Sequence, residues 1–300
     1  MSVSATDQLE ENSSRNGALS ALSAYLLWGF APIYFKLLTD IEPGEILMHR
    51  IIWSTVFLLV MIIIMKKWSP LIAICRQPKV LLQLSLSASF LGVNWFLFIW
   101  AVNNNHLLDA SLGYYINPLF NVILGMIFFN ERLRRNQLIA VCLALVGVLI
   151  QLIALGKLPM ISLVLASTFA IYGLLRKKLP INSFIGLLIE SLMMLPIALI
   201  YWYFFVESNT SNMAINTTSL NVTLIMAGIV TTAPLLFFTA AAKRLTLSTL
   251  GFFQYLGPSI MFLLATFYYQ ETMKSAELIT FVFIWAALVL YSLDSFKKRT

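Results

Sequence analysis

The sequence predicts an all-α membrane protein with ten transmembrane helices in two inverted five-helix repeats. Three observations support this fold class: the composition is strongly apolar, ten stretches have membrane-spanning length, and the two halves of the chain are similar. Of the 300 residues, 60% are hydrophobic and 11% are charged, with a mean hydropathy of +0.86. A soluble domain has about 45–50% apolar and about 25% charged residues. The composition therefore excludes an ordinary soluble enzyme, a coiled coil, a collagen and a disordered chain.

Ten stretches of about 20 mostly apolar residues match the thickness of a bilayer. The connections are short and leave no room for a soluble domain; the longest is the polar segment 207–221. The expected spans are residues 18–38, 45–65, 80–103, 108–129, 137–155, 158–176, 182–206, 222–242, 249–269 and 276–294. We expect a polar N-terminal tail without a signal peptide, a first repeat, a second inverted repeat and a basic C-terminal tail, over residues 1–17, 18–155, 156–294 and 295–300.

Positive residues are distributed unevenly over the connections. If the N-terminus is cytoplasmic, the cytoplasmic segments hold 16 of the 20 Lys and Arg residues and the outer segments hold only 2. By the positive-inside rule, both termini are expected in the cytoplasm. The formal net charge of +7 is then a signal of topology, and no nucleic-acid partner is expected. The two cysteines, Cys75 and Cys142, have no metal-binding or disulfide spacing and are expected to be reduced and structurally minor.

The two halves of the chain align without a gap over long stretches when the sequence is shifted by 140 residues, so that Pro118 is aligned with Pro258. At this shift, which we call the repeat offset, Glu131 meets Glu271. Because each half holds five spans, an odd number, the second half enters the membrane in the opposite sense. Inverted repeats are typical of secondary transporters, which bind their substrate near the bilayer midplane at the repeat interface. We expect Glu131 and Glu271, each at the end of a span, to have structural roles such as helix capping.

Two ionisable side chains fall deep inside the predicted spans. Arg50 lies 7 residues past Pro43, and Glu190 lies 10 residues past Pro180. An ionisable group in a span is costly to insert and is a functional candidate by default. The two positions are one repeat offset apart, so we hypothesise that both line a central cavity, either as a counter-ion pair or as contacts for substrate and protons. The alternative is structural: Arg50 extends to the interface, and Glu190 bonds a neighbouring helix.

Further polar and aromatic side chains in the spans are candidates for the same cavity. Pro118 and Pro258 lack a backbone N–H and can kink their helices, which frees carbonyl groups near the midplane. Aromatic rings with a polar tip suit a site for a partly apolar solute, whereas the same side chains can instead serve helix packing. The candidates are Trp28, Asn94, Trp95, Tyr114, Tyr115, Asn117, Tyr172, Gln254 and Tyr255.

Several blocks of sequence resemble the RarD branch of the EamA family, in the drug/metabolite transporter superfamily. The blocks are NW at 94–95, FIWAVN at 98–103, LDASLGYYINPL at 108–119, FAIYGLLRK at 169–177 and FQY at 253–255. The resemblance covers residues 18–294. It implies the drug/metabolite transporter fold, a location in the bacterial inner membrane, and transport of small metabolites or drugs. The name of the branch links it to chloramphenicol sensitivity.

The leading functional hypothesis is a secondary transporter. It would lie in the lipid bilayer and move a small-molecule substrate across it by alternating access. No G-x-x-x-x-G-K-[ST] loop is present, so ATP hydrolysis is not expected to drive it. Proton coupling through Glu190 and facilitated diffusion are both compatible with the sequence. Enzyme motifs such as H-E-x-x-H are absent, so no catalytic residue, cofactor or metal is expected. The alternative is a sensor or assembly subunit on a transporter scaffold; the oligomeric state is open.

Overall fold

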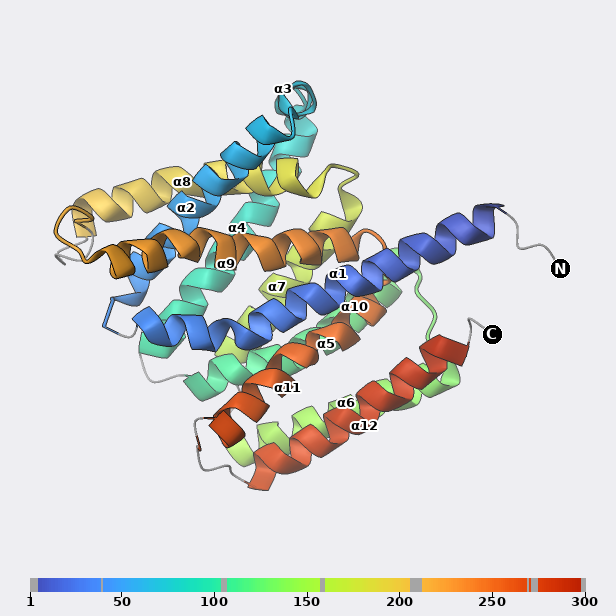
Figure 1. The fold of residues 1–300 in the computed structure, drawn as a ribbon. Coiled ribbons are helices and arrows are strands. Elements are labelled where there is room, and N and C mark those ends of the chain that lie inside the picture. The colour runs from blue at the N-terminus through green and yellow to red at the C-terminus, as the bar shows by residue number, and fades with distance from the viewer. Residues whose placement is uncertain are drawn as a thin grey trace.

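The structure, a computed structural model, describes residues 5–38, 40–103, 107–156, 160–205, 212–268, 270 and 275–297. The elements within these residues are helices that form one elongated bundle (Figure 1). In chain order they are α1 (Ala5–Phe35), η1 (Lys36–Leu38), α2 (Pro43–Ile64), α3 (Trp68–Cys75), α4 (Pro78–Asn103), α5 (Leu107–Phe129), α6 (Arg135–Leu155), α7 (Met160–Lys178), α8 (Ser183–Phe205), α9 (Thr218–Ala242), α10 (Leu247–Gln254), α11 (Leu256–Leu263), η3 (Leu264–Tyr268) and α12 (Ser275–Lys297).

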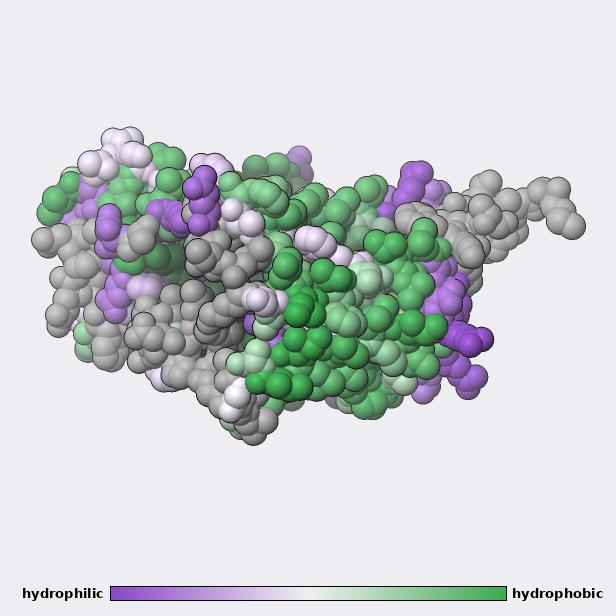
Figure 2. Space-filling model, turned by 90° about the horizontal axis from the view of Figure 1, so that it is seen from below, coloured by the Kyte–Doolittle hydropathy of each residue, from purple (hydrophilic) through white to green (hydrophobic). Residues whose placement is uncertain are grey.

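Within the described residues, nine helical segments are long and apolar enough to cross a membrane. They are Asn12–Leu38, Pro43–Ile64, Pro78–Phe98, Leu112–Phe129, Arg135–Ala154, Met160–Lys178, Ser183–Phe204, Thr218–Ala242 and Leu247–Tyr268. The last predicted span, 276–294, falls in α12, where the apolar part Leu278–Asp294 is shorter. On the face shown in Figure 2, a broad hydrophobic region lies between hydrophilic ends. The chain is therefore a multi-pass helical membrane protein, as its composition predicts.

Three features of the helices differ from the sequence prediction. Helix α1 begins at Ala5 rather than near residue 18, so the polar segment ahead of the span is also helical. The connection after α2 contains the short helix α3. The span predicted over 249–269 is divided at Tyr255 into α10 and α11, because Pro258 cannot donate to the carbonyl group four residues earlier. Helix α5, in contrast, continues through Pro118.

Corresponding helices in the two halves begin at equivalent positions. Helices α2 and α8 begin one repeat offset apart, and so do α4 and α9, α5 and α10, and α6 and α12. Asn130 and Gln270, which the same offset relates, share a left-handed backbone with φ of 50° and 52°. The pairs α2–α8, α5–α10 and α6–α12 are in contact. Tyr255 also donates a hydrogen bond of 3.3 Å to the backbone carbonyl of Tyr115, which lies one repeat offset, 140 residues, earlier in the chain.

Helices α6 and α12 lie side by side at one edge of the bundle (Figure 1). Arg134 forms a salt bridge of 3.1 Å with Asp294, and Asn136 donates to the same carboxylate at 3.1 Å. Further along, Thr280 donates to the backbone carbonyl of Gly147 at 3.0 Å. These contacts join the last helix of the first half to the last helix of the second.

Glu131, just after α5, caps the first turn of α10. Its carboxylate accepts hydrogen bonds from the backbone N–H groups of Leu247 at 2.7 Å and Ser248 at 3.0 Å, and from the Ser248 hydroxyl at 2.7 Å. The first N–H groups of a helix have no partner inside it, and a negative charge is favourable at this end. Glu131 therefore has the structural role that the sequence predicts, whereas Glu271 lies outside the described residues.

We expect Glu131→Ala to destabilise the protein by about 1–2 kcal/mol, because α10 loses the acceptor for its first N–H groups. Glu131→Gln should cost less, since it keeps an acceptor oxygen and loses only the charge. Thermal unfolding of the purified protein in detergent, followed by circular dichroism, measures both. The matched control is Arg132→Ala at the exposed neighbouring position. A loss as large as that of Glu131→Ala in this control would contradict the capping role.

Candidate functional site

A small cavity lies between α2, α4, α8 and α9. The volume of the cavity is about 10 Å³, which is room for about one water molecule. Its walls are mostly apolar, with a few hydroxyl groups and one carboxylate, a mixture typical of small-molecule sites. The lining residues are Ser54, Leu58, Leu91, Trp95, Leu187, Glu190, Ser191, Met194, Thr231, Thr232 and Leu235.

Six of these lining residues form three pairs that the repeat offset relates. The pairs are Ser54 with Met194, Leu91 with Thr231, and Trp95 with Leu235. Each residue of the first two pairs lies near the middle of its helix. The cavity therefore lies where equivalent positions of the two halves meet, about halfway along the four helices.

Helices α2 and α9 cross closely beside this cavity. A Cβ atom at Gly228 would overlap the backbone carbonyl carbon of Trp53 and lie 2.6 Å from the backbone nitrogen of Ser54. Such distances are far below van der Waals contact with atoms that cannot easily move, so the crossing requires glycine. The Ser54 hydroxyl also donates to the Gly228 carbonyl at 3.2 Å. Ser54 is thus fixed in its position on the cavity wall.

Arg50 stands beside the cavity, against two of its lining residues. Its Nε donates to the Thr231 hydroxyl at 2.8 Å, and its guanidinium carbon lies 4.8 Å from the centre of the Trp95 ring. The Phe35 ring of α1 lies at 5.6 Å. Contacts of this kind, between a cation and a ring face, lower the cost of holding the charge away from water. Arg50 is therefore held between α1, α4 and α9.

Glu190 is fully buried and pairs with Arg176, which is also fully buried. Its Oε1 accepts a hydrogen bond from the Ser87 hydroxyl at 2.7 Å and lies 3.4 Å from Nη1 of Arg176. The hypothesis that Arg50 is the counter-ion of Glu190 is therefore wrong. Arg50 and Glu190 each lie two turns past the start of their helices, and α2 and α8 start from opposite ends of the bundle (Figure 1). Arg176 is closer because α7 ends where α8 begins.

Several polar atoms of this buried cluster have no hydrogen-bond partner among the described residues. They are Oε2 of Glu190, Nε and Nη2 of Arg176, and the hydroxyl of Tyr172. A buried polar atom without a partner is costly. Glu190 also lines the cavity. A water molecule in the cavity is therefore placed to supply a hydrogen-bond partner for its carboxylate.

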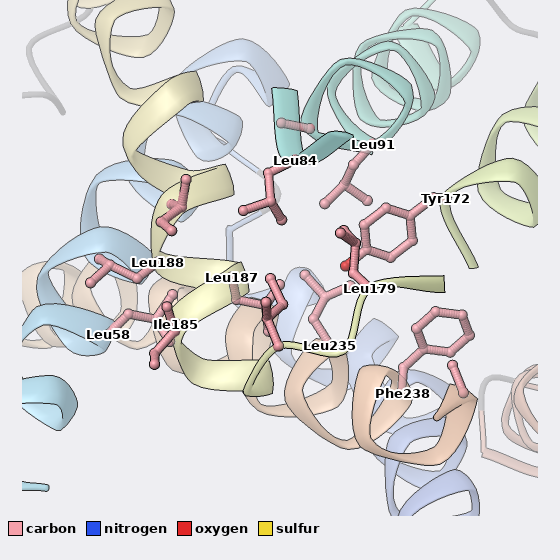
Figure 3. Close-up of a cluster of buried hydrophobic side chains, with 14 of the residues drawn as sticks. Leu58, Leu84, Leu91, Tyr172, Leu179, Ile185, Leu187, Leu188, Leu235 and Phe238 are labelled. Atoms are coloured by element: carbon pink, nitrogen blue, oxygen red, sulfur yellow. The ribbon is translucent and has the colours of Figure 1, made fainter. Parts of the chain in front are cut away.

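Apolar side chains pack tightly around this end of the cavity. Leu84 and Leu91 of α4, Leu187 of α8 and Leu235 of α9 point toward one another in Figure 3. Leu235 is the least buried of the four, at 4% exposed. Their packing fills the space between the three helices and leaves only the small cavity beside them.

Trp28 and Tyr172 lie in an aromatic cluster outside the cavity wall. The Trp28 ring lies 5.8 Å from the Phe169 ring and 5.9 Å from the Phe238 ring, measured between centroids. Tyr172 stacks on Phe238 at 5.9 Å. The cluster joins α1, α7 and α9.

The predicted amides hold neighbouring helices together. Asn94 of α4 donates to the backbone carbonyl of Leu165 at 2.8 Å and to the Thr168 hydroxyl at 3.0 Å, both on α7. Asn117 of α5 donates to the backbone carbonyl of Ala166, also on α7, at 2.6 Å. Two helices of the first half are thereby tied to the first helix of the second half.

A second group of predicted residues joins α5 to α10. Asn121 donates to Oδ1 of Asn117 at 3.1 Å and to Oε1 of Gln254 at 3.2 Å. Tyr115 and Tyr255 meet through the hydrogen bond described above. In this structure these side chains serve contacts between helices and do not line the cavity.

Of the predicted site residues, Glu190 and Trp95 line the cavity, and Arg50 contacts its wall. Tyr114 is 38% exposed and lies close enough to Arg50 to interact with its charge. That Arg50 and Glu190 both lie at the cavity, at its opposite ends, could be anticipated from the sequence, because the repeat offset relates the two positions.

Sequence reasoning missed Arg176, Ser87 and Thr231 as partners of the two intramembrane charges. Arg176 is the last residue of the predicted span 158–176 and is counted among the cytoplasmic positive charges with Lys177 and Lys178, yet its side chain is fully buried. One signal was available, since a buried carboxylate requires a nearby cation, and Arg176 is one short hairpin away from Glu190. Hydroxyl partners carry no comparable signal in an apolar span.

Comparison with known proteins identifies a membrane transporter. The EamA-like transporter family matches residues 15–153. Protein RarD of Escherichia coli (strain K12) is 53% identical over 294 residues, which are 97% of this chain and 99% of that protein. An uncharacterized transporter of Vibrio cholerae serotype O1 is 51% identical over 288 residues, 96% of this chain and 95% of that one. The chain belongs to the RarD branch of the EamA-like transporter family.

The helical arrangement is also shared with a solved protein of distant sequence. A crystal structure of a protein superposes with a TM-score of 0.73 at 17% identity, and the match covers 95% of this chain and 99% of that chain. At this level of identity the likeness shows a common fold.

Removing one member of the Arg176–Glu190 pair should destabilise the protein by about 3–5 kcal/mol, because the other charge stays buried without its partner. Removing both, in Arg176→Met with Glu190→Met, should restore most of this loss. Thermal unfolding in detergent of the two single variants and the double variant measures the coupling. The control is Arg134→Met, which breaks the partly exposed pair with Asp294 and should cost at most about 1 kcal/mol. Additive losses in the double variant would contradict the pairing.

Lys243, directly after α9, should make stability depend on alkaline pH. Burial, and then repulsion from Arg176 and Arg244, lowers the pKa of Lys243 to about 8, although Glu190 opposes the shift. The unfolded chain then binds more protons between about pH 8 and the ordinary value of 10.5, so stability rises with pH in this window.

Lys243→Gln should therefore raise the melting temperature below about pH 8, and this gain should shrink as the pH approaches about 10.5. Melting curves at a series of pH values test the expectation. Arg132→Gln removes an exposed charge that is not among the groups acting on Lys243 and is the control, since arginine stays protonated over this range. An equal gain at every pH for Lys243→Gln would refute the assignment.

Proposed function

We propose that this protein is a secondary transporter of the bacterial inner membrane that moves a small metabolite or drug-like solute by alternating access. In this proposal it has ten transmembrane helices in two inverted five-helix repeats, and both termini are cytoplasmic. The observation that carries the proposal is the position of the cavity: it lies halfway along four helices and is lined by pairs of residues that the repeat offset relates. Transporters with inverted repeats bind their solutes at such a place.

In the alternating-access step, each repeat adopts the conformation that the other repeat had before, so that the cavity opens to the opposite side of the membrane. Arg50 and Glu190 occupy equivalent positions at opposite ends of the cavity region, so the arrangement around one can be adopted around the other. In this structure the Glu190 end is closed by the pair with Arg176 and by the packed leucines. Opening this end requires the salt bridge and the leucine packing to separate together.

The predicted residues take two kinds of role in this scheme. Arg50, Glu190, Trp95 and Tyr114 contact the solute as it passes the cavity. The remaining residues hold the helices that move against one another, with Pro118 and Pro258 at the places where two of these helices can bend. This second group contains Trp28, Asn94, Tyr115, Asn117, Tyr172, Gln254 and Tyr255.

Glu190 is the group through which a proton gradient would act. Its Oε2 has no hydrogen-bond partner among the described residues, and the residue lines the cavity. Protonation would remove its charge and weaken the contact with Arg176, which favours opening of that end. Facilitated diffusion needs no such step, and flux measurements separate the two.

Flux in proteoliposomes tests the transport proposal. The panel contains labelled amino acids, small metabolites and chloramphenicol, the last because of the name of the branch, each with and without a pH gradient. Ser191→Phe places a ring in the space that the solute would occupy; a loss of about 1.4–2.8 kcal/mol in solute binding lowers affinity, and with it flux at low solute concentration, by about 10- to 100-fold. Leu192→Phe, on the next residue and 40% exposed, is the matched control and should transport normally.

Glu190→Gln decides the mode of coupling in the same assay. Flux that follows the pH gradient in the wild type but not in this variant would make the protein a proton-coupled carrier. Flux that depends on neither would make it a facilitator in which Glu190 is structural. Absence of flux for every compound would contradict the transport proposal and favour a sensor or assembly subunit.

A further inference from the structure

Arg50 has a fixed orientation beside the cavity. The hydrogen bond from its Nε to Thr231 and the ring faces of Trp95 and Phe35 hold the guanidinium group on three sides. Thr231 and Trp95 are themselves part of the cavity wall. A planar guanidinium held in this way is prepared to receive a ligand, because little side-chain freedom remains to be lost on binding.

The terminal nitrogens of Arg50 are not used by the described part of the chain. They donate to no acceptor there, and neither nitrogen is among the atoms sealed from solvent without a partner. No carboxylate of the described residues forms a salt bridge with Arg50, in contrast to Arg176 and Arg134. Arg50 is thus a partly buried cation inside the bundle whose terminal donor groups have no acceptor among the described residues.

The surroundings of Arg50 are suited to a ligand that is partly aromatic or apolar. The Trp95 ring continues from the guanidinium onto the cavity wall, and the exposed Tyr114 lies close to the charge. The contacts of the guanidinium are a hydroxyl group and ring faces, so they add no second positive charge. One uncompensated charge matches a monoanion, whereas a phosphate dianion would bring an unbalanced negative charge into the span.

We propose that Arg50 is the receptor for a carboxylate, and that the transported solute is a small organic monocarboxylate whose apolar part packs against Trp95. This inference rests on the proposed transport function and names the substrate class of the same site. The two terminal N–H groups of an arginine match the two oxygens of a carboxylate in a bidentate pair. The ligand would supply the acceptor atoms that the described chain does not.

Thermal stabilisation of the detergent-solubilised full chain tests carboxylate binding with defined probes. Benzoate and phenylacetate are compared with benzamide and phenylacetamide, which have the same shape without the charge, and with inorganic phosphate. We expect the two carboxylates to raise the melting temperature of the wild type in a saturable way and the amides and phosphate to have little effect. Equal shifts for acid and amide would overturn the proposal.

Substitutions locate the effect. Arg50→Gln should weaken the two carboxylates by about 10- to 100-fold, the loss expected for a charge-assisted hydrogen bond, and should leave the amides unchanged. Arg50→Lys keeps the charge without the bidentate geometry and should retain part of the affinity. Arg134→Gln removes an arginine from the distant pair with Asp294 and should bind as the wild type does. Full carboxylate binding by Arg50→Gln would overturn the assignment even if the protein transports.

The failures of the two proposals are distinguishable. If neutral solutes of the panel are transported and carboxylates show no preference, the protein is a transporter and the carboxylate inference is wrong. If carboxylates bind through Arg50 and no solute crosses the membrane, the binding site stands and the transport function is wrong.

Discussion

A lipid bilayer offers no hydrogen-bond partner to a polar group, and this constraint shapes the polar contacts between the helices. The side chains of Asn94 and Asn117 bond to backbone carbonyls of α7, and Thr280 bonds to a carbonyl of α6. Each of these bonds also places one helix against another at a defined height. Polar side chains would be costly in an apolar bundle without hydrogen-bond partners. With these partners they fix which helices are in contact and at which positions along their length.

The same constraint explains why the two intramembrane charges have different surroundings although their positions are equivalent. Glu190 has a cation and a hydroxyl group within reach and is fully buried with them. Arg50 has ring faces and one hydroxyl group, and its outer nitrogens stay open. The bundle therefore carries a charge with a cation partner, Glu190, on α8 and a charge without a carboxylate partner among the described residues, Arg50, on α2. The two ends of the cavity region therefore differ in their electrostatic surroundings.

Much of the fold follows from the sequence, because the length of the apolar stretches and the repeat offset are properties of the chain itself. The repeat points to Arg50 and Glu190, and Trp95 is one of the polar and aromatic candidates in the spans. The partners are harder to predict. Asn117 and Tyr172 are polar side chains inside predicted spans, as residues of a cavity are expected to be, yet the rotation of their helices directs them to α7 and Phe238. Arg176 is misplaced by sequence reasoning because a helix end rich in positive residues looks like a loop, and sequence does not show that the first of them turns inward.

The contact between α6 and α12 has a consequence for how the chain is made. Arg134, Asn136 and the carbonyl of Gly147 belong to the first half, yet their partners Asp294 and Thr280 lie on α12, far later in the chain. Glu131 likewise serves the start of α10. These contacts can form only once α12 has been synthesised and has packed against α6. A chain that stops before α12 would leave Arg134 and Asn136 without these partners.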